Sequence, residues 1–181
     1  MTVMREWSVA GALLFDEGGR LLLVQNLRRG GALDWTPPGG VIEIAEGETV
    51  LDGLAREVIE ETGLTVTGWA EQAYEVIAEA PDMGWRLKVE VHVAAEWSGD
   101  LKVGDDPDGI VIDARFVDPA SCAQQVADAH PWVGEPLAAW LTGWVGAAGD
   151  VASRRWSYRL DGAQGQTTIT RLHPPRRSVE S

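Results

Sequence analysis

The chain has 181 residues, of which 45% are hydrophobic, enough to bury the core of one domain. Acidic residues outnumber basic ones by 28 to 15, and the resulting net charge of −13 argues against nucleic acid as a partner; a phosphate-bearing substrate needs bound cations or a local basic cluster. The single cysteine, Cys122, excludes an intrachain disulfide and a multi-cysteine zinc site, and it fits the reducing cytoplasm, where we expect the protein to act.

The N-terminal segment is predicted to form a β-hairpin. Apolar runs at Ser8 to Phe15 and Arg20 to Gln25 flank a turn-forming stretch, Asp16 to Gly19. The first run is too short to cross a membrane, so we expect no membrane partner. The next two segments cannot form a regular helix because of their glycines and prolines: Arg28-Arg29-Gly30-Gly31 and Trp35-Thr36-Pro37-Pro38-Gly39-Gly40.

A helix is predicted to begin after Thr49 and to end before Gly63. Thr49 and Asp52 have the spacing of a capping box, and glycine often follows the last helical turn. The apolar face recurs at spacings of four, three and four residues: Leu51, Ala55, Val58 and Thr62.

The second half of the chain is predicted to be mainly β. Four segments have strand character: Leu64 to Trp69, Gln72 to Ala78, Trp85 to Ala95 and Ile110 to Val117. A helix is expected over Glu135 to Ala147, and a terminal hairpin pairs Arg154 to Leu160 with Gln166 to Leu172. We therefore divide the chain into a domain at 1–150, a hairpin extension at 151–173 and a flexible tail at 174–181.

Three carboxylates share one face of the predicted helix. Glu57, Glu60 and Glu61 stand at positions i, i+3 and i+4, and Arg56 precedes Glu60 by four residues. An acidic helix face is usually just solvated surface. Hard divalent cations prefer carboxylate oxygen, so a metal site is the alternative.

The wider pattern decides between these readings. Gly39-Gly40, then Glu48, then Arg56-Glu57, then Glu60-Glu61 and Gly63-Leu64 together resemble the Nudix box. One feature differs: seven residues separate Gly40 from Glu48 where the family usually has five, so the first loop is two residues longer, around Glu43 to Glu46. The resemblance implies an α/β fold, a Nudix-like α/β/α sandwich with a central mixed sheet, to which the terminal hairpin is an addition.

The resemblance also implies roles for the box residues. Glu57 and Glu61 would be the principal ligands of Mg²⁺ or Mn²⁺, with Glu60 and the Gly40 carbonyl completing the site. Arg56 would pair with Glu48 and orient the ligands. The metal ions would neutralise phosphate charge and activate a water molecule.

Residues outside the box are candidates for the remaining tasks. Arg28 and Arg29 could grip phosphate, and Arg86 could line the substrate pocket from a strand. The general base is open, with candidates in an acidic loop and at a strand end: Asp105, Asp106, Asp108 and Glu96.

The predicted function is metal-dependent hydrolysis of a phosphoanhydride bond in a nucleoside diphosphate derivative or a nucleoside triphosphate, oxidised ones included. ADP-ribose or nucleotide-sugar hydrolysis is an alternative. Two other classes remain as rivals: a non-catalytic nucleotide-sensing regulator, and a prenyl diphosphate isomerase, for which Cys122 lies far along the chain from the box. The partner is thus a small nucleotide, and a homodimer stays open.

Overall fold

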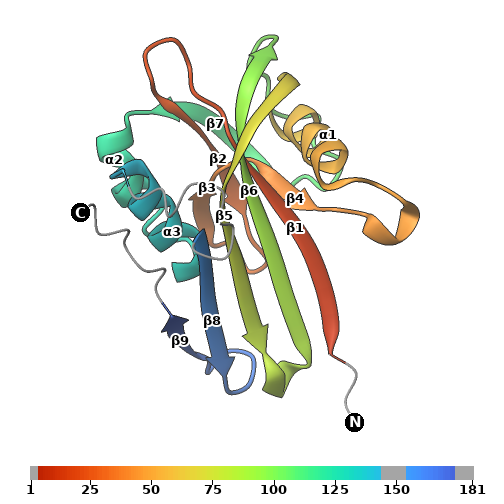
Figure 1. The fold of residues 1–181 in the computed structure, drawn as a ribbon, viewed down its shortest axis with the longest axis vertical. Coiled ribbons are helices and arrows are strands. Elements are labelled where there is room, and N and C mark those ends of the chain that lie inside the picture. The colour runs from red at the N-terminus through yellow and green to blue at the C-terminus, as the bar shows by residue number, and fades with distance from the viewer. Residues whose placement is uncertain (1–3, 144–153, 174–181) are drawn as a thin grey trace, which may run out of the picture.

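The computed structural model describes residues 4–143 and 154–173 (Figure 1). The strands are β1 (Arg5–Leu13), β2 (Leu21–Leu27), β3 (Leu33–Thr36), β4 (Gly39–Val41), β5 (Thr65–Ala80), β6 (Trp85–Ser98), β7 (Val111–Val117), β8 (Arg155–Asp161) and β9 (Thr168–His173). The helices are α1 (Val50–Thr62), α2 (Pro119–Gln125) and α3 (Pro131–Leu141), with 3-10 turns η1 (Ile44–Glu46) and η2 (Pro81–Met83).

Two sheets organise the fold. The larger has six strands in the order β4-β1-β6-β5-β8-β9, and the smaller has three in the order β3-β2-β7. In the large sheet, β1 runs parallel to β6 and β5 runs parallel to β8, whereas the other neighbours are antiparallel. The predicted mixed central sheet is therefore confirmed.

Helices cover both faces of the large sheet, because alternate side chains of a strand point to opposite faces. Ala10 and Ala12 of β1 pack in one hydrophobic cluster with Leu54 and Val58 of α1. Leu13 belongs to a second cluster, which includes the buried face of α3. Figure 1 shows α1 on one side of the sheet and α2 with α3 on the other, as expected for the α/β/α sandwich.

Three predicted elements differ from the structure. The N-terminal hairpin is absent as a strand pair, because β1 and β2 belong to different sheets and only an isolated bridge between Phe15 and Leu21 joins them beside the turn. The strands expected at 64–69 and 72–78 are one long strand, β5, whose register against β6 shifts between Val66 and Tyr74, so bulges bend the strand without ending it. The helix expected from Glu135 begins earlier, at Pro131, because proline is favoured in the first turn, and it ends at Leu141. The end of the predicted helix at 144–147, the start of the predicted extension at 151–153 and the predicted tail at 174–181 lie outside the described residues.

The terminal hairpin is present and joins the main sheet. β8 pairs with β5, and the three apolar side chains of β8 that alternate along the strand are buried in the cluster shared with α3: Trp156, Tyr158 and Leu160. The Tyr158 hydroxyl donates a hydrogen bond of 2.9 Å to Glu135 of α3. Among the described residues, no helix combines the length and hydropathy required to cross a membrane.

Candidate active site

Helix α1 forms where the sequence predicts it, with both caps in place. The Thr49 hydroxyl accepts a hydrogen bond of 3.2 Å from the Asp52 amide and donates one of 2.7 Å to the Asp52 carboxylate. Gly63 ends the helix at a φ of 73°, a conformation that glycine adopts without strain. Leu54 and Val58 are fully buried against the sheet, and this fixes the rotation of the helix and so the direction of its carboxylates.

Glu57 lies directly against Gly40 at the edge of the large sheet. A Cβ atom at position 40 would stand 2.4 Å from Glu57 Oε2, a distance that two unbonded atoms cannot adopt. Gly39 is packed equally closely, because a Cβ atom at this position would meet the Ala10 carbonyl oxygen of β1. The glycine pair therefore lets the carboxylate of α1 contact the backbone of β4.

Glu61 lies deeper than Glu57 and is only 8% exposed. Its Oε2 accepts a hydrogen bond of 2.9 Å from the Gly39 amide. The pKa of Glu61 is raised to about 8, chiefly by burial and also by the nearby Glu57 and Asp106 carboxylates. The Gly39 hydrogen bond and the Arg28 charge act in the opposite direction. The pKa of Glu57 is also raised, chiefly by burial. Because Arg56 contacts Glu57, Glu61 is the carboxylate of the pair whose negative charge is less compensated.

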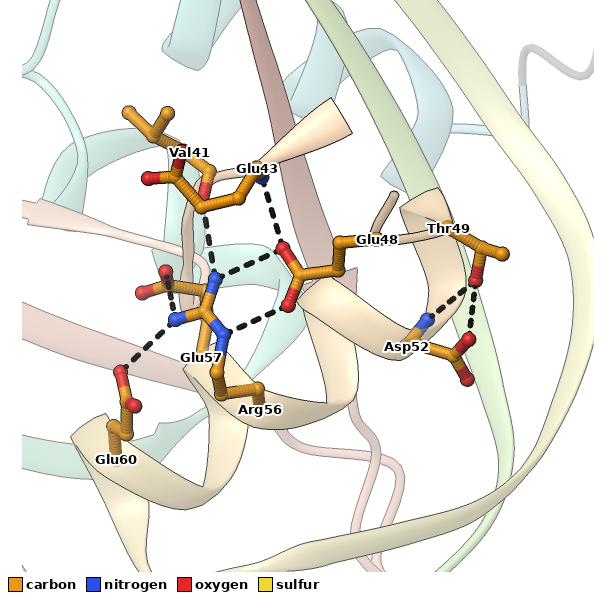
Figure 2. Close-up of polar contacts among 8 residues, drawn as sticks. All are labelled: Val41, Glu43, Glu48, Thr49, Asp52, Arg56, Glu57 and Glu60. Atoms are coloured by element: carbon orange, nitrogen blue, oxygen red, sulfur yellow. Dashed lines mark hydrogen bonds and ion pairs between the residues drawn. The ribbon is translucent and has the colours of Figure 1, made fainter. Parts of the chain in front are cut away.

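Arg56 connects four groups of the box (Figure 2). Its guanidinium contacts both Glu48 oxygens at 2.9 and 3.2 Å, Glu57 at 2.7 Å, Glu60 at 3.2 Å and the Val41 carbonyl at 3.3 Å. Hydrogen bonding to Arg56 holds the pKa of Glu48 below its usual value. Glu48 also accepts a hydrogen bond of 2.9 Å from the Glu43 amide, so the longer first loop is tied to the helix through this ion pair.

The predicted metal-binding groups fit a hard divalent cation in chemistry. Glu57 lies against Gly40 and Glu61 contacts the neighbouring Gly39 amide. Both carboxylates have raised pKa values, and a divalent cation would stabilise their ionised forms. Glu60 is turned toward Arg56. Within residues 4–143 and 154–173, no group of three or more His, Cys, Asp or Glu side chains already stands in a geometry that could hold an ion.

The acidic loop before β7 approaches the box carboxylates. Asp108 lies close enough to raise the pKa of Glu57, and Asp106 has the same effect on Glu61. Asp106 is occupied by hydrogen bonds from the Asp108, Ile110 and Val111 amides, all near 3.0 Å. Asp105 is exposed and pairs with Lys102 at 2.6 Å, and Glu96 is exposed on β6. Asp108 is exposed as well, but its charge acts on Glu57; the identity of the general base stays a prediction.

Arg28 lies beside the box, whereas the other two predicted substrate-binding arginines do not. A cavity of about 230 Å³ is lined by Arg28, Gly39 and Gly40 together with apolar residues of β1 and β6. Arg29 is exposed in the turn after β2 and does not line this cavity. Arg86 pairs with Glu79 at 3.2 Å and with Glu6 at 3.7 Å. It precedes the cavity-lining Leu87 on β6, so its side chain points to the opposite face of the sheet. A role of Arg86 in substrate binding stays a prediction.

Sequence reasoning missed the polar residues that hold Arg28. The Arg28 Nε donates to Asp34 at 2.9 Å, and the buried Asn26 donates to Asp34 and to Thr36 at 2.9 and 3.0 Å. Asn26 and Asp34 are 4% and 7% exposed, so both are polar side chains inside otherwise apolar strands. An Asn at the end of an apolar run and an Asp before Trp35 were the available signals, because a buried polar group needs a partner.

Residues 5–141 match the model of the NUDIX domain. The chain therefore belongs to the Nudix family, whose members are hydrolases that act on pyrophosphate bonds and generally use divalent metal ions. A MutT-like protein of Streptomyces ambofaciens is 48% identical over 59 residues, which cover 33% of this chain and 34% of that protein. The chain thus matches about a third of the length of this curated relative.

Solved structures show the same fold. The E. coli ORF135 protein superimposes with a TM-score of 0.65 at 20% identity, covering 81% of this chain and 96% of that chain. A MutT protein from Bacillus halodurans gives a TM-score of 0.59 at 20% identity and covers 91% of this chain and 97% of that chain. At these identities the similarity establishes the fold alone.

Proposed function

We propose that this protein hydrolyses a phosphoanhydride bond in a small nucleotide, either a nucleoside diphosphate derivative or a nucleoside triphosphate, with Mg²⁺ or Mn²⁺ as cofactor. The observation that supports this most strongly is the pair of carboxylates at Gly39-Gly40, of which Glu61 is buried and Glu57 is partly buried. Burial raises the pKa of Glu61 to about 8, so its ionised form at neutral pH needs a further positive charge beside it. The pKa of Glu57 is also raised, although Arg56 contacts its carboxylate. A divalent cation is the charge that best suits carboxylate ligands and a diphosphate substrate together.

The box residues would have separate roles in holding and orienting the metal ion. Glu57, Glu61 and the Gly40 carbonyl would hold the metal ion, and Glu60 would join them by exchanging its contact with Arg56. A bound divalent ion supplies neutralisation of phosphate charge and acidification of a water molecule. Arg56 fixes the direction of Glu57 through its contacts with Glu48 and Val41.

Two residues outside the box complete the proposed reaction. Arg28, held by Asp34 at the mouth of the cavity, would bind a phosphate oxygen of the substrate. Asp108 would accept the proton from the attacking water, since its carboxylate lies near Glu57 in a loop outside the helix.

The direct test is a substrate panel with matched variants. Purified protein with Mg²⁺ is incubated with nucleoside triphosphates, oxidised deoxynucleoside triphosphates, ADP-ribose and nucleotide sugars, and the products are separated by chromatography. We expect Glu57→Gln and Glu61→Gln each to lower turnover by about a hundredfold or more while the circular dichroism spectrum is unchanged. Glu17→Gln, in the exposed β1–β2 turn, is the control and should keep normal turnover. Near-normal rates in either box variant would reject the assignment.

The same panel tests the alternatives. Release of AMP from ADP-ribose or of a nucleoside monophosphate from nucleotide sugars, without triphosphate hydrolysis, would favour the ADP-ribose or nucleotide-sugar enzyme. Nucleotide binding with no product from any substrate would favour the non-catalytic regulator. Against an isomerase with a catalytic cysteine, Cys122 is fully buried, and burial raises the pKa of its thiol to about 11.

A further inference from the structure

A second, wider depression lies next to the cavity beside the box. The first cavity, of about 230 Å³, contains Gly39, Gly40 and Arg28, and the second has a volume of about 790 Å³. Leu87 and Trp132 line both, so the two cavities are direct neighbours on the α3 side of the large sheet. We call the wider one the tryptophan trough; Trp7, Trp85 and Trp132 line it.

The two cavities follow one another along strands β1 and β6, because alternate side chains of these strands point to the same face of the sheet. Gly11, Val9 and Trp7 of β1 lie opposite Val91, Val89 and Leu87 of β6, and these side chains share one face of the sheet. From Gly11, beside the box, to Trp7 the strand advances four residues, roughly 13 Å at about 3.3 Å per residue. A group bound at the box could thus extend along the sheet into the trough.

The terminal hairpin forms the far wall of the trough. Leu160, Gln164, Gly165 and Thr167 line it, and all four lie beyond residue 141, where the match to the family model ends. The hairpin turn is anchored, because the Gly162 amide donates a hydrogen bond of 2.9 Å to Asp82 in η2. The hairpin strand β8 is also fixed, because Tyr158 hydrogen-bonds to Glu135 of α3, the helix that contains Trp132.

The aromatic rings of the trough are held in place by their neighbours. The Arg5 guanidinium lies 3.9 Å from the centroid of the Trp7 ring. The His130 and Trp132 rings are stacked, with centroids 4.1 Å apart and an interplanar angle of 12°. Preorganised indole rings are suited to stacking on a planar aromatic group of any base type.

We propose that the trough binds the nucleobase of the substrate, with the sugar in the smaller cavity and the diphosphate at the box. This inference rests on the proposed function for the position of the diphosphate. The smaller cavity, at about 230 Å³, is below the roughly 300–1,000 Å³ of ordinary ligand pockets, whereas the trough, at about 790 Å³, is within that range. In this arrangement the tryptophans stack on the base, and Gln164 of the hairpin hydrogen-bonds to its edge. The hairpin is therefore a specificity element for the base.

The experiment measures binding of products and does not depend on turnover. AMP, GMP and ribose 5-phosphate are titrated into the full-length protein with Mg²⁺ in a calorimeter. We expect Trp7→Ala and Trp85→Ala each to weaken binding of AMP and GMP about tenfold and to leave ribose 5-phosphate unchanged, on the scale of one lost stacking contact. Trp97→Ala is the matched control, because Trp97 is also half-buried but stacks on Phe116 away from the trough.

A surface variant guards against misfolding of the tryptophan variants. Gln164 is exposed, so Gln164→Ala should keep the melting temperature and weaken binding of AMP or GMP about fivefold, on the scale of one lost hydrogen bond. Unchanged AMP and GMP affinity in both tryptophan variants would overturn the position of the base, and unchanged affinity in Gln164→Ala would overturn the role of the hairpin. Tryptophan-dependent AMP binding without hydrolysis of any substrate would reject the proposed function while supporting this inference.

Discussion

The Glu57 carboxylate occupies the space that a side chain at position 40 would need. A Cβ atom there would stand 2.4 Å from Glu57 Oε2 and 2.5 Å from the carboxyl carbon. The contact joins the end of the first box segment to the middle of α1, seventeen positions further along the chain. Because Glu57 is a flexible side chain, a substitution at Gly40 would displace the carboxylate and spare the backbone.

We therefore predict that Gly40→Ala separates activity from stability. Displacement of Glu57 should lower turnover about a hundredfold and raise the Mg²⁺ concentration needed for half-maximal rate, because metal ligands tolerate little displacement. The melting temperature should fall by only a few degrees, corresponding to about 1 kcal/mol. Gly68→Ala is the control, since its Cβ would meet Glu96 at an ordinary 3.5 Å. Equal turnover in the two variants would show that the Gly40 contact is not functional.

Arg56→Lys is expected to fail despite its retained charge. A lysine ammonium cannot reproduce the fork that contacts Glu48, Glu57 and the Val41 carbonyl together, so Glu57 would lose its fixed direction. We expect a tenfold to hundredfold loss of metal affinity, about the usual effect of removing a group that orients a ligand. Mn²⁺ titration followed by electron paramagnetic resonance would measure it. Arg20→Lys, in the exposed pair with Asp16, should bind Mn²⁺ like the wild type; equal affinity in Arg56→Lys would refute the orienting role.

Asp108→Asn should reveal whether the acidic loop supplies the general base. Loss of a positioned base costs about a hundredfold to ten-thousandfold in rate, and the acid limb of the pH–rate profile should disappear with it. Asp105→Asn removes a charge from the same loop but only breaks an exposed pair with Lys102, so its profile should match the wild type. If both variants behave alike, the base lies elsewhere.

The stability of the metal-free protein should fall as the pH rises from about 4.5 to about 8. The folded-state pKa of Glu61 is raised from the ordinary value of 4.5 to about 8, so the folded state binds the proton more tightly than the unfolded state. The contribution of protonated Glu61 to the free energy of unfolding is fully present below pH 4.5 and is lost as the pH rises through 8. The loss is on the order of a few kcal/mol.

Urea denaturation at pH 5 to 8 would measure this loss. Addition of Mg²⁺ should reduce it, because a cation beside Glu61 favours the ionised carboxylate. Glu61→Gln cannot titrate and should show a flatter dependence in EDTA. Identical pH dependence in the wild type and in Glu61→Gln would mean that Glu61 does not carry the effect.

Local sequence patterns predicted much of the fold. The caps and the apolar period of α1 and the terminal hairpin depend on residues close together in the chain, and each is present. The hairpin predicted around Asp16 was wrong as a pairing, because β1 and β2 form but belong to different sheets. The two short strands β3 and β4 and the helix α2 were missed, because three to seven residues contain too little periodicity to be recognised. The division of β5 into two strands was wrong because a bulge and a turn have similar residue patterns.

For this protein, the order of residues alone determined the carboxylate face of α1, its Arg56 and the flanking glycines, since helix geometry converts spacing into direction. Tertiary structure decided which of these groups meet, how deeply Glu61 is buried, that Asp34 holds Arg28, and that the hairpin closes the tryptophan trough. The physical reason is that burial and contact depend on strand pairing between segments far apart in the chain, and no local pattern specifies that pairing.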